Sequence, residues 1–153
     1  MGKWRTLAEF SLSSEPGNER SASEQVTLAV KELNLSAKRL ERLKTAVAEA
    51  TMNAMEHGNK YRPDLPVSVR VLISEAESAL SVQITDRGGD QPIPDPEMPD
   101  LDAKLAGQQT PRGWGLFLIE KMVDEVYVTS DERHHTVELI LYLKGAEHAG
   151  QTT

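Results

Sequence analysis

The stretch that decides the fold of this chain reads Glu49-Ala50-Thr51-Met52-Asn53-Ala54-Met55-Glu56-His57-Gly58. Its polar residues Glu49, Asn53 and His57 are spaced four apart, which places them along one edge of a helix. Asn and His are poor helix formers, so their presence there suggests a purpose other than solvation. A carboxylate can accept a proton from a hydroxyl, and an Asn carbonyl oxygen can ligate Mg²⁺. This pair of groups suits phosphoryl transfer.

The same stretch closes a longer predicted helix that begins after Ser36, its expected N-cap, and runs to about His57. Gly58 then stands where a left-handed C-terminal cap is expected. The polar edge also carries Lys38 and Arg42, so a merely solvated face is the alternative to a ligand-binding edge. The apolar residues of the helix gather on its other side: Leu40, Leu43, Val47, Ala50, Ala54 and Met55.

The rest of the sequence predicts the α+β class, as a two-layer α/β sandwich. Strands are expected at about 4–12, as an edge strand, and at about 67–73, 80–85, 125–130 and 136–143. A last helix is expected from about Gly115 to Val123. Because the strands pair as hairpins, we expect a mixed, mainly antiparallel sheet with helices covering one face. An early helix carries apolar residues at helical spacing: Val26, Leu28, Ala29, Val30 and Leu33.

The composition is that of one globular domain, with 153 residues, 39% of them hydrophobic and 27% charged. We expect this domain to span residues 1–145, with a long functional loop at about 87–112 and a flexible tail at 146–153. A net charge of -7 argues against a nucleic-acid partner and favours a basic protein partner. The lack of cysteine and of any membrane-spanning apolar run leads us to expect a cytoplasmic protein that does not bind membranes.

Two further clusters can carry chemistry. Asp86-Arg87-Gly88-Gly89-Asp90 begins where a predicted strand ends, and such an Asp can recognise an exocyclic amine, although an ordinary turn is the alternative. Arg112-Gly113-Trp114-Gly115-Leu116 lies at the start of the last predicted helix, where free N–H groups and the helix dipole favour phosphate. Arg112 adds a possible charge-assisted contact, and a tight turn before the helix is the alternative.

Together the three clusters resemble the motifs of the GHKL ATPases. The stretch from Glu49 to Gly58 resembles the N box, in the form typical of the bacterial anti-sigma-factor serine kinases. The segment from Asp86 to Gly89 is similar to the first glycine box, and the segment from Arg112 to Leu116 is similar to the second, in the family's order and spacing. The resemblance covers about residues 4–143.

This resemblance implies that the chain binds ATP and Mg²⁺ between the sheet and the helices. Asn53 would hold Mg²⁺, Asp86 would receive the adenine amino group, and Glu49 would be the base that activates a partner's hydroxyl. The segment at about 87–112 would be the lid over ATP, and His57 would have a structural role. The other nucleotide contacts that the resemblance implies are Gly88, Arg112, Gly113, Gly115, Leu116 and Thr136.

The function that the resemblance implies is that of an anti-sigma-factor regulator. It would bind a sigma factor and phosphorylate a serine or threonine on an anti-sigma antagonist protein, as a homodimer whose first strand offers an edge for pairing. The alternative is a docking module with weak or no ATP binding. Asp90 favours this alternative, because it replaces an expected glycine with a carboxylate near the phosphates, whereas Glu49 opposes it.

Two other functions fit less well. The catalytic half of a histidine kinase shares the fold, but we do not expect it here because the sequence shows no upstream helix pair with a phosphoacceptor histidine. Metal hydrolysis through His134 and His135 would need a third ligand, and neighbouring side chains on a strand point to opposite faces.

Overall fold

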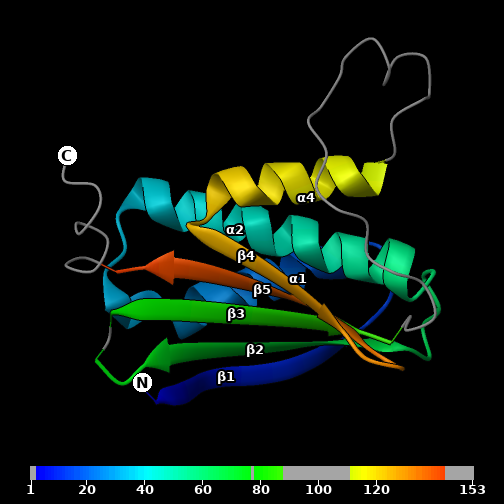
Figure 1. The fold of residues 1–153 in the computed structure, drawn as a ribbon, viewed down its shortest axis with the longest axis horizontal. Helices are drawn as coiled ribbons and strands as arrows, with labels where there is room; N and C mark the ends of the chain where they lie inside the picture. The colour runs from blue at the N-terminus through cyan, green and yellow to red at the C-terminus, as the bar shows by residue number, and fades with distance from the viewer. Residues whose placement is uncertain (1–2, 77, 88–110, 144–153) are drawn as a thin grey trace, which may run out of the picture.

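The computed structural model describes residues 3–76, 78–87 and 111–143, and only the backbone of residues 111–116. Within these ranges a sheet carries the longer helices on one of its two faces (Figure 1). The element η1 is a short 3₁₀ helix and η2 is one π-helical turn. The elements follow one another as β1 (Trp4–Ser13), α1 (Asn18–Ala29), η1 (Lys31–Leu33), α2 (Ala37–Asn53), η2 (Ala54–Gly58), β2 (Pro66–Ser74), β3 (Ala79–Asp86), α4 (Pro111–Met122), β4 (Glu125–Ser130) and β5 (His135–Tyr142).

The sheet has five strands in the order β1-β2-β3-β5-β4, so β1 and β4 are its edges. Every described pairing is antiparallel, including the one between β3 and the last strand of the chain, β5. The predicted α+β class, the mainly antiparallel sheet and the single helix-covered face are therefore confirmed.

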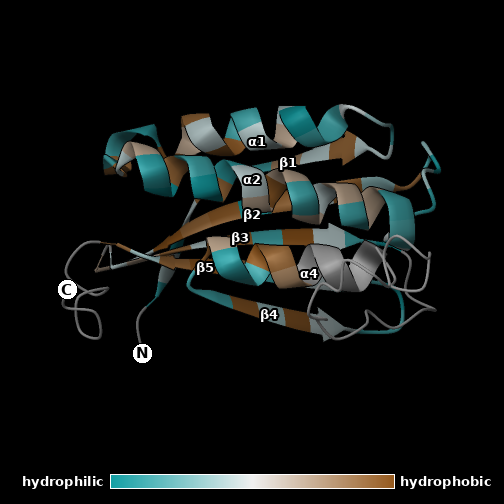
Figure 2. Ribbon diagram, turned by 90° about the horizontal axis from the view of Figure 1, so that it is seen from above, coloured by the Kyte–Doolittle hydropathy of each residue, from teal (hydrophilic) through white to brown (hydrophobic). Residues whose placement is uncertain are grey.

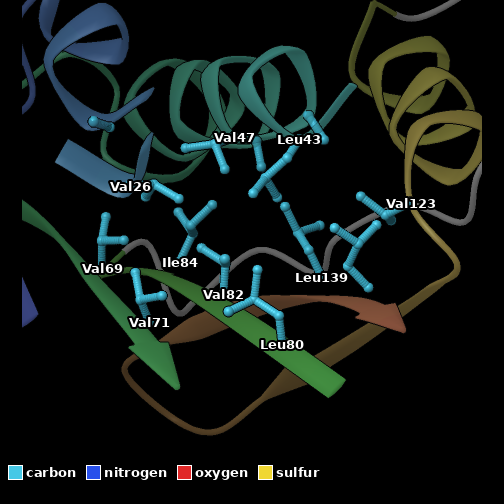
Figure 3. Packing of buried hydrophobic residues seen from close by; sticks show 14 of the residues in the cluster. Val26, Leu43, Val47, Val69, Val71, Leu80, Val82, Ile84, Val123 and Leu139 are labelled. Carbon is cyan, nitrogen blue, oxygen red and sulfur yellow. The ribbon is translucent and has the colours of Figure 1, made fainter. Parts of the chain in front are cut away.

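The core lies between this sheet and the three helices α1, α2 and α4. Alternation along β2 turns Val69 and Val71 toward the helices, where both are fully buried, and leaves Arg70 exposed on the other face. Seen from above, the helices cover the sheet side by side (Figure 2), and their apolar side chains meet those of the strands (Figure 3). Complete burial of a Val or Leu side chain stabilises the fold by roughly 1.5–3 kcal/mol.

The long helix α2 begins as the sequence predicts. Ser36 precedes it with extended backbone, and its Oγ accepts a hydrogen bond from the backbone N–H of Arg39 at 3.2 Å. On α1 the predicted apolar face contains one error, because Leu28 is 70% exposed. Leu28 stands two residues beyond the buried Val26, about 200° away around the helix, and therefore faces water.

The last helix, α4, begins at Pro111 rather than near Gly115. Proline suits the first position of a helix, because its fixed φ matches the helix and its missing N–H would have no intrahelical partner there. The glycines of this cluster therefore lie inside the first turns instead of before them. Among the described residues, no helix combines the length and the apolar character needed to cross a membrane.

Candidate functional site

The carboxyl end of α2 is the first component of the candidate site. Asn53 ends this helix and is only 8% exposed, so a solvated edge does not explain its presence. Its Nδ2 group is buried and has no hydrogen-bond partner in the described part of the structure. Because buried polar groups in native proteins are nearly always paired, an orphaned amide here is the kind of feature that ligand binding explains.

The helix widens directly after Asn53, in the π-helical turn η2. The N–H of Asn59 donates to the carbonyl of Ala54, five residues back, at 2.9 Å. The predicted left-handed cap at Gly58 is wrong, because the positive φ angles, 56° and 54°, belong to Lys60 and Tyr61. The π-helical turn continues through Gly58, so the chain reverses later. Such turns are frequent at functional sites.

Gly58 is required by its closeness to Asp86 rather than by its own backbone angles. A Cβ atom at this glycine would lie 2.2 Å from both Cγ and Oδ2 of Asp86, far inside van der Waals contact. Asp86 is the last residue of β3. The missing Cβ therefore lets the end of the first sequence cluster lie directly against the carboxylate that opens the second.

His135, the first residue of β5, contacts the same carboxylate. It is the register partner of Asp86, and its Nδ1 lies 3.2 Å from Asp86 Oδ1. The two side chains are 1% and 4% exposed. Since an ionised carboxylate only accepts hydrogen bonds, Nδ1 carries the proton in this pair. The other ring nitrogen, Nε2, is buried without a hydrogen-bond partner among the described residues.

Asn59 anchors the backbone that follows Asp86. Its Oδ1 accepts a hydrogen bond from the N–H of Arg87 at 2.7 Å, and the residue is fully buried. Because one side chain ties the turn after η2 to the residues that directly follow β1 and β3 and to the start of β2, several segments set the position of Asp86 at once. The Nδ2 group of Asn59 donates at 3.0, 3.0 and 3.2 Å to Ser14 Oγ, the carbonyl of Leu65 and the carbonyl of Pro66.

Sequence reasoning missed Asn59, and it considered His135 only as a metal ligand and not as a contact of Asp86. Asn59 directly follows the motif that ends at Gly58, and a polar residue between a helix and a strand reads as an ordinary turn residue. For His135 a signal existed, since it alternates with Val137 and Leu139, which pack in or against the core. That alternation places His135 on the helix-covered face.

Thr136 lies on the opposite face of the sheet from Asp86. Its neighbour His135 shares the helix-covered face, so Thr136 must point away from the helices. Its Oγ1 pairs instead with Thr85 Oγ1, 2.9 Å away on β3. The structure therefore does not bring Thr136 together with the other residues that were expected to contact the nucleotide.

Glu49, the expected base, is half-buried one helical turn before Asn53. Burial raises the pKa of its carboxyl above the usual value, and the negative charge of Glu56 raises it further. A carboxylate with a raised pKa holds a proton more strongly than an ordinary glutamate, which suits general-base chemistry. Glu49 borders a small cavity of about 60 Å³ between α2 and α4, lined also by Thr45, Ala46, Leu118, Ile119 and Met122.

The third sequence cluster forms the beginning of α4. In a helix that starts at Pro111, the backbone of Arg112 and Gly113 belongs to the first turn, whose N–H groups have no intrahelical acceptor. Gly115 lies beyond that turn. The helix start thus offers N–H groups to an anion, mainly from residues before Gly115. The remaining residues named from the sequence lie outside the described residues: the predicted contact Gly88, the motif departure Asp90, the predicted lid up to residue 110, and the side chains of Arg112 and Leu116.

The described residues contain no group of three or more His, Cys, Asp or Glu side chains that could hold a metal ion. Mg²⁺ commonly keeps several waters and binds through one or two protein ligands together with substrate phosphates. The carbonyl oxygen of Asn53 is a neutral, hard ligand of the kind that Mg²⁺ accepts. The residues present therefore fit a magnesium ion that arrives with a nucleotide, rather than a preformed metal cage.

The chain is similar to known proteins over most of its length. Residues 11–141 match the family described as histidine kinase-like ATPase domain. An anti-sigma F factor of Geobacillus stearothermophilus is 33% identical over 145 residues, which cover 94% of this chain and 93% of the relative. The serine-protein kinase RsbW of Bacillus subtilis is 32% identical over 118 residues, covering 74% of this chain and 71% of the relative.

A solved structure shares the fold. The crystal structure of the RsbU and RsbW domains of Rv1364c from Mycobacterium tuberculosis superposes with a TM-score of 0.61 at 16% identity. The match covers 89% of this chain and 32% of that longer one. From the site geometry, the match over residues 11–141 and the likeness to anti-sigma factors, we conclude that the chain belongs to the histidine kinase-like ATPase domain family.

Proposed function

We propose that this chain is an anti-sigma-factor regulator that binds Mg-ATP and phosphorylates a serine or threonine on an anti-sigma antagonist protein. The observation that carries the proposal is the contact between Gly58 and Asp86, which is too close for any Cβ. It sets a buried carboxylate at a strand end against the helix that carries Glu49 and Asn53. The relative named anti-sigma F factor, matched over 94% of this chain, supports the regulatory role.

In this proposal Asp86 recognises adenine. Its carboxylate oxygens accept hydrogen bonds, and the exocyclic amine of adenine donates one, whereas guanine presents a carbonyl oxygen at that position. The N–H groups in the first turn of α4 receive phosphate oxygens, helped by the partial positive charge of a helix N-terminus. Asn53 holds Mg²⁺, which when bound neutralises charge that develops on the phosphates.

Glu49 acts as the base in the transfer step. Its carboxylate takes the proton of the partner's hydroxyl while the hydroxyl oxygen attacks the γ-phosphorus of ATP. An O–P bond forms on the partner's side chain, the bond from the γ-phosphorus to the β–γ bridging oxygen breaks, and ADP leaves with the electron pair. Because burial raises the pKa of Glu49, its carboxylate accepts this proton more readily than an ordinary glutamate would.

The proposed partners are a sigma factor and the antagonist protein. With a net charge of -7, the chain favours partners that present basic surfaces. A homodimer is part of the proposal, since β1 is an edge strand and carries Trp4, which is 44% exposed. Unpaired strand edges with exposed apolar side chains are favourable places for chains to associate.

A docking module that regulates a partner without useful kinase turnover is the second candidate. Asp90 favours it, because a carboxylate close to the phosphates of ATP would repel them. The presence of Glu49, with its raised pKa, favours the kinase. The two candidates differ in one measurable property, the transfer of phosphate to a partner protein.

The first experiment is calorimetric titration of the purified chain with Mg-ATP, with Asn53→Ala and Asp86→Asn alongside. We expect wild type to bind and both variants to bind at least tenfold more weakly, since each loses a hydrogen bond or metal contact, worth about 1.5–3 kcal/mol when a charged group takes part. Asn53→Ala should lose no stability from the Nδ2 group, which has no described hydrogen-bond partner. No binding by wild type at millimolar ATP would remove the kinase proposal.

A second experiment separates the kinase from the docking module. Glu49→Gln keeps the size of the side chain but cannot accept the proton, so we expect ATP binding to persist and phosphate transfer to an antagonist protein to fall about 10²–10⁴-fold. Transfer at the wild-type rate would exclude Glu49 as the base. Binding of ATP by wild type without any transfer would favour the docking module.

A further inference from the structure

The nucleotide site proposed above leaves one buried polar group at Asp86 without a role, the imidazole of His135. The residues that alternate with it on β5, Val137 and Leu139, are apolar and contribute to the core or pack against it. An apolar side chain would fill this position without leaving a buried nitrogen unpaired, which is unfavourable. Yet His135 is 1% exposed, and its Nε2 has no hydrogen-bond partner in the described ranges.

We propose that His135 is a positioning residue that holds the Asp86 carboxylate in the orientation that selects a purine with an amino group at C6. The inference rests on the proposed function, since it concerns the same nucleotide site. It assigns the β5 contact to His135 instead of to Thr136, which faces the other side of the sheet.

The contact itself explains how His135 acts. Nδ1–H donates to Oδ1 of Asp86 over 3.2 Å, and Oδ2 lies 2.2 Å from the position that a Cβ of residue 58 would take, so His135 and Gly58 confine the carboxylate from two sides. A carboxylate of fixed rotation presents its acceptor lone pairs in fixed directions, which a freely turning one does not.

The chemistry of the pair also decides which base edge it tolerates. With Nδ1–H donating to one of its oxygens, the Asp86 carboxylate still offers only acceptor atoms to a bound base. An amino group at C6 satisfies them, and a carbonyl oxygen or a bare C–H at C6 does not.

The test compares Mg-ATP with the Mg complex of purine riboside triphosphate, which lacks the 6-amino group. We expect wild type to prefer ATP and His135→Leu to lose about tenfold of that preference, the size expected for one misplaced hydrogen bond. His135→Asn retains an amide N–H that can reach Asp86, so it should keep most of the preference. Thr136→Val, on the opposite face, is the matched control and should leave the preference unchanged.

A residue that only supports the fold would change the two affinities by the same factor. An unchanged preference in His135→Leu therefore overturns the role of His135 while the proposed function stands. Equal binding of both nucleotides by wild type overturns it as well. If wild type binds neither nucleotide, the proposed function fails and the inference fails with it.

Imidazole ¹⁵N spectra of the wild type keep the test decisive should His135→Leu fail to fold. ATP is expected to shift the Nδ1 resonance of His135, because the adenine amine donates a hydrogen bond to the same carboxylate that accepts one from Nδ1–H. Purine riboside triphosphate should shift it less. Equal shifts with the two nucleotides would contradict the role of His135 in selecting the amine.

Discussion

Two neighbouring pairs of residues on β3 and β5 differ in burial, in charge and in the face of the sheet on which they lie. Asp86 pairs with His135 on the helix-covered face, and both side chains are buried. One residue further along, Thr85 pairs with Thr136 on the open face, through hydroxyl groups 2.9 Å apart that are only partly buried. The first pair is a buried hydrogen bond to a carboxylate, and the second is a neutral hydrogen bond near water.

The difference follows from the two-residue period of a strand. A step of one residue along β5 moves a side chain to the other face of the sheet. On the helix-covered face a charged pair must be complete, because a buried charge without its partner is strongly destabilising. On the open face water can replace a lost partner. The comparison predicts that substitutions in the two pairs will differ widely in effect.

The largest effect is expected from His135→Leu. It leaves the Asp86 carboxylate buried without the imidazole, so the free energy of unfolding should fall by about 3–5 kcal/mol at neutral pH. Urea denaturation followed by circular dichroism measures this change. The double variant His135→Leu/Asp86→Leu is the control, because replacing both partners with apolar groups should recover part of the loss. A loss below about 1 kcal/mol would show that water already reaches the pair.

Gly58→Ala is expected to have the next largest effect. The new Cβ would lie 2.2 Å from two atoms of Asp86. The Asp86 side chain is short, buried and held by His135, so it has little room to move. Insertion of an extra carbon into such a place destabilises a protein by about 1–3 kcal/mol. Gly17→Ala suits as a comparison for strain alone, since Gly17 has a φ of 101° and no atom within 4 Å of its added Cβ. A free energy of unfolding in Gly58→Ala equal to that of wild type, measured by urea denaturation, would contradict the close packing of Asp86 against Gly58.

Thr136→Val should change the stability only slightly. Valine keeps the shape and the strand preference of threonine. The Thr85 hydroxyl, partly buried on the open face, can then form its hydrogen bond with water. The expected loss is about 1 kcal/mol or less, the net value of one neutral hydrogen bond. Chemical denaturation beside His135→Leu gives the direct contrast between the two faces. A loss as large as that of His135→Leu would mean that the open face is covered in solution.

Glu49 on α2 is half-buried, and its expected effect on stability is the smallest. Because its folded-state pKa is raised above 4.5, its contribution to stability is largest below the unfolded pKa and is lost as the pH rises through the folded value. Phosphate transfer should respond in the opposite direction and rise with pH, since the base must be ionised. Denaturation and transfer rates between pH 4 and 8, compared with Glu49→Gln, measure both trends; a rate that does not depend on pH would speak against Glu49 as the base.

Much of the fold could be predicted from local patterns. The strands at 67–73, 80–85, 125–130 and 136–143 lie within one or two residues of β2, β3, β4 and β5, because alternation and turn residues are local signals. Helix α2 and its cap at Ser36 followed from helical spacing and a capping side chain. The errors at Leu28, Gly58 and the start of α4 concern helix ends, where a shift of a few residues changes the pattern little.

By itself, the sequence determined the class of the fold, the family motifs and the identity of Glu49, Asn53 and Asp86 as candidates, since these depend on residue types at short spacing. Only the tertiary structure decided that Gly58 lies against Asp86, and that His135 is the register partner of Asp86 across β3 and β5. Those contacts join segments that are distant along the chain. They depend on strand register and on helix packing against the sheet, and no local pattern of residues specifies either.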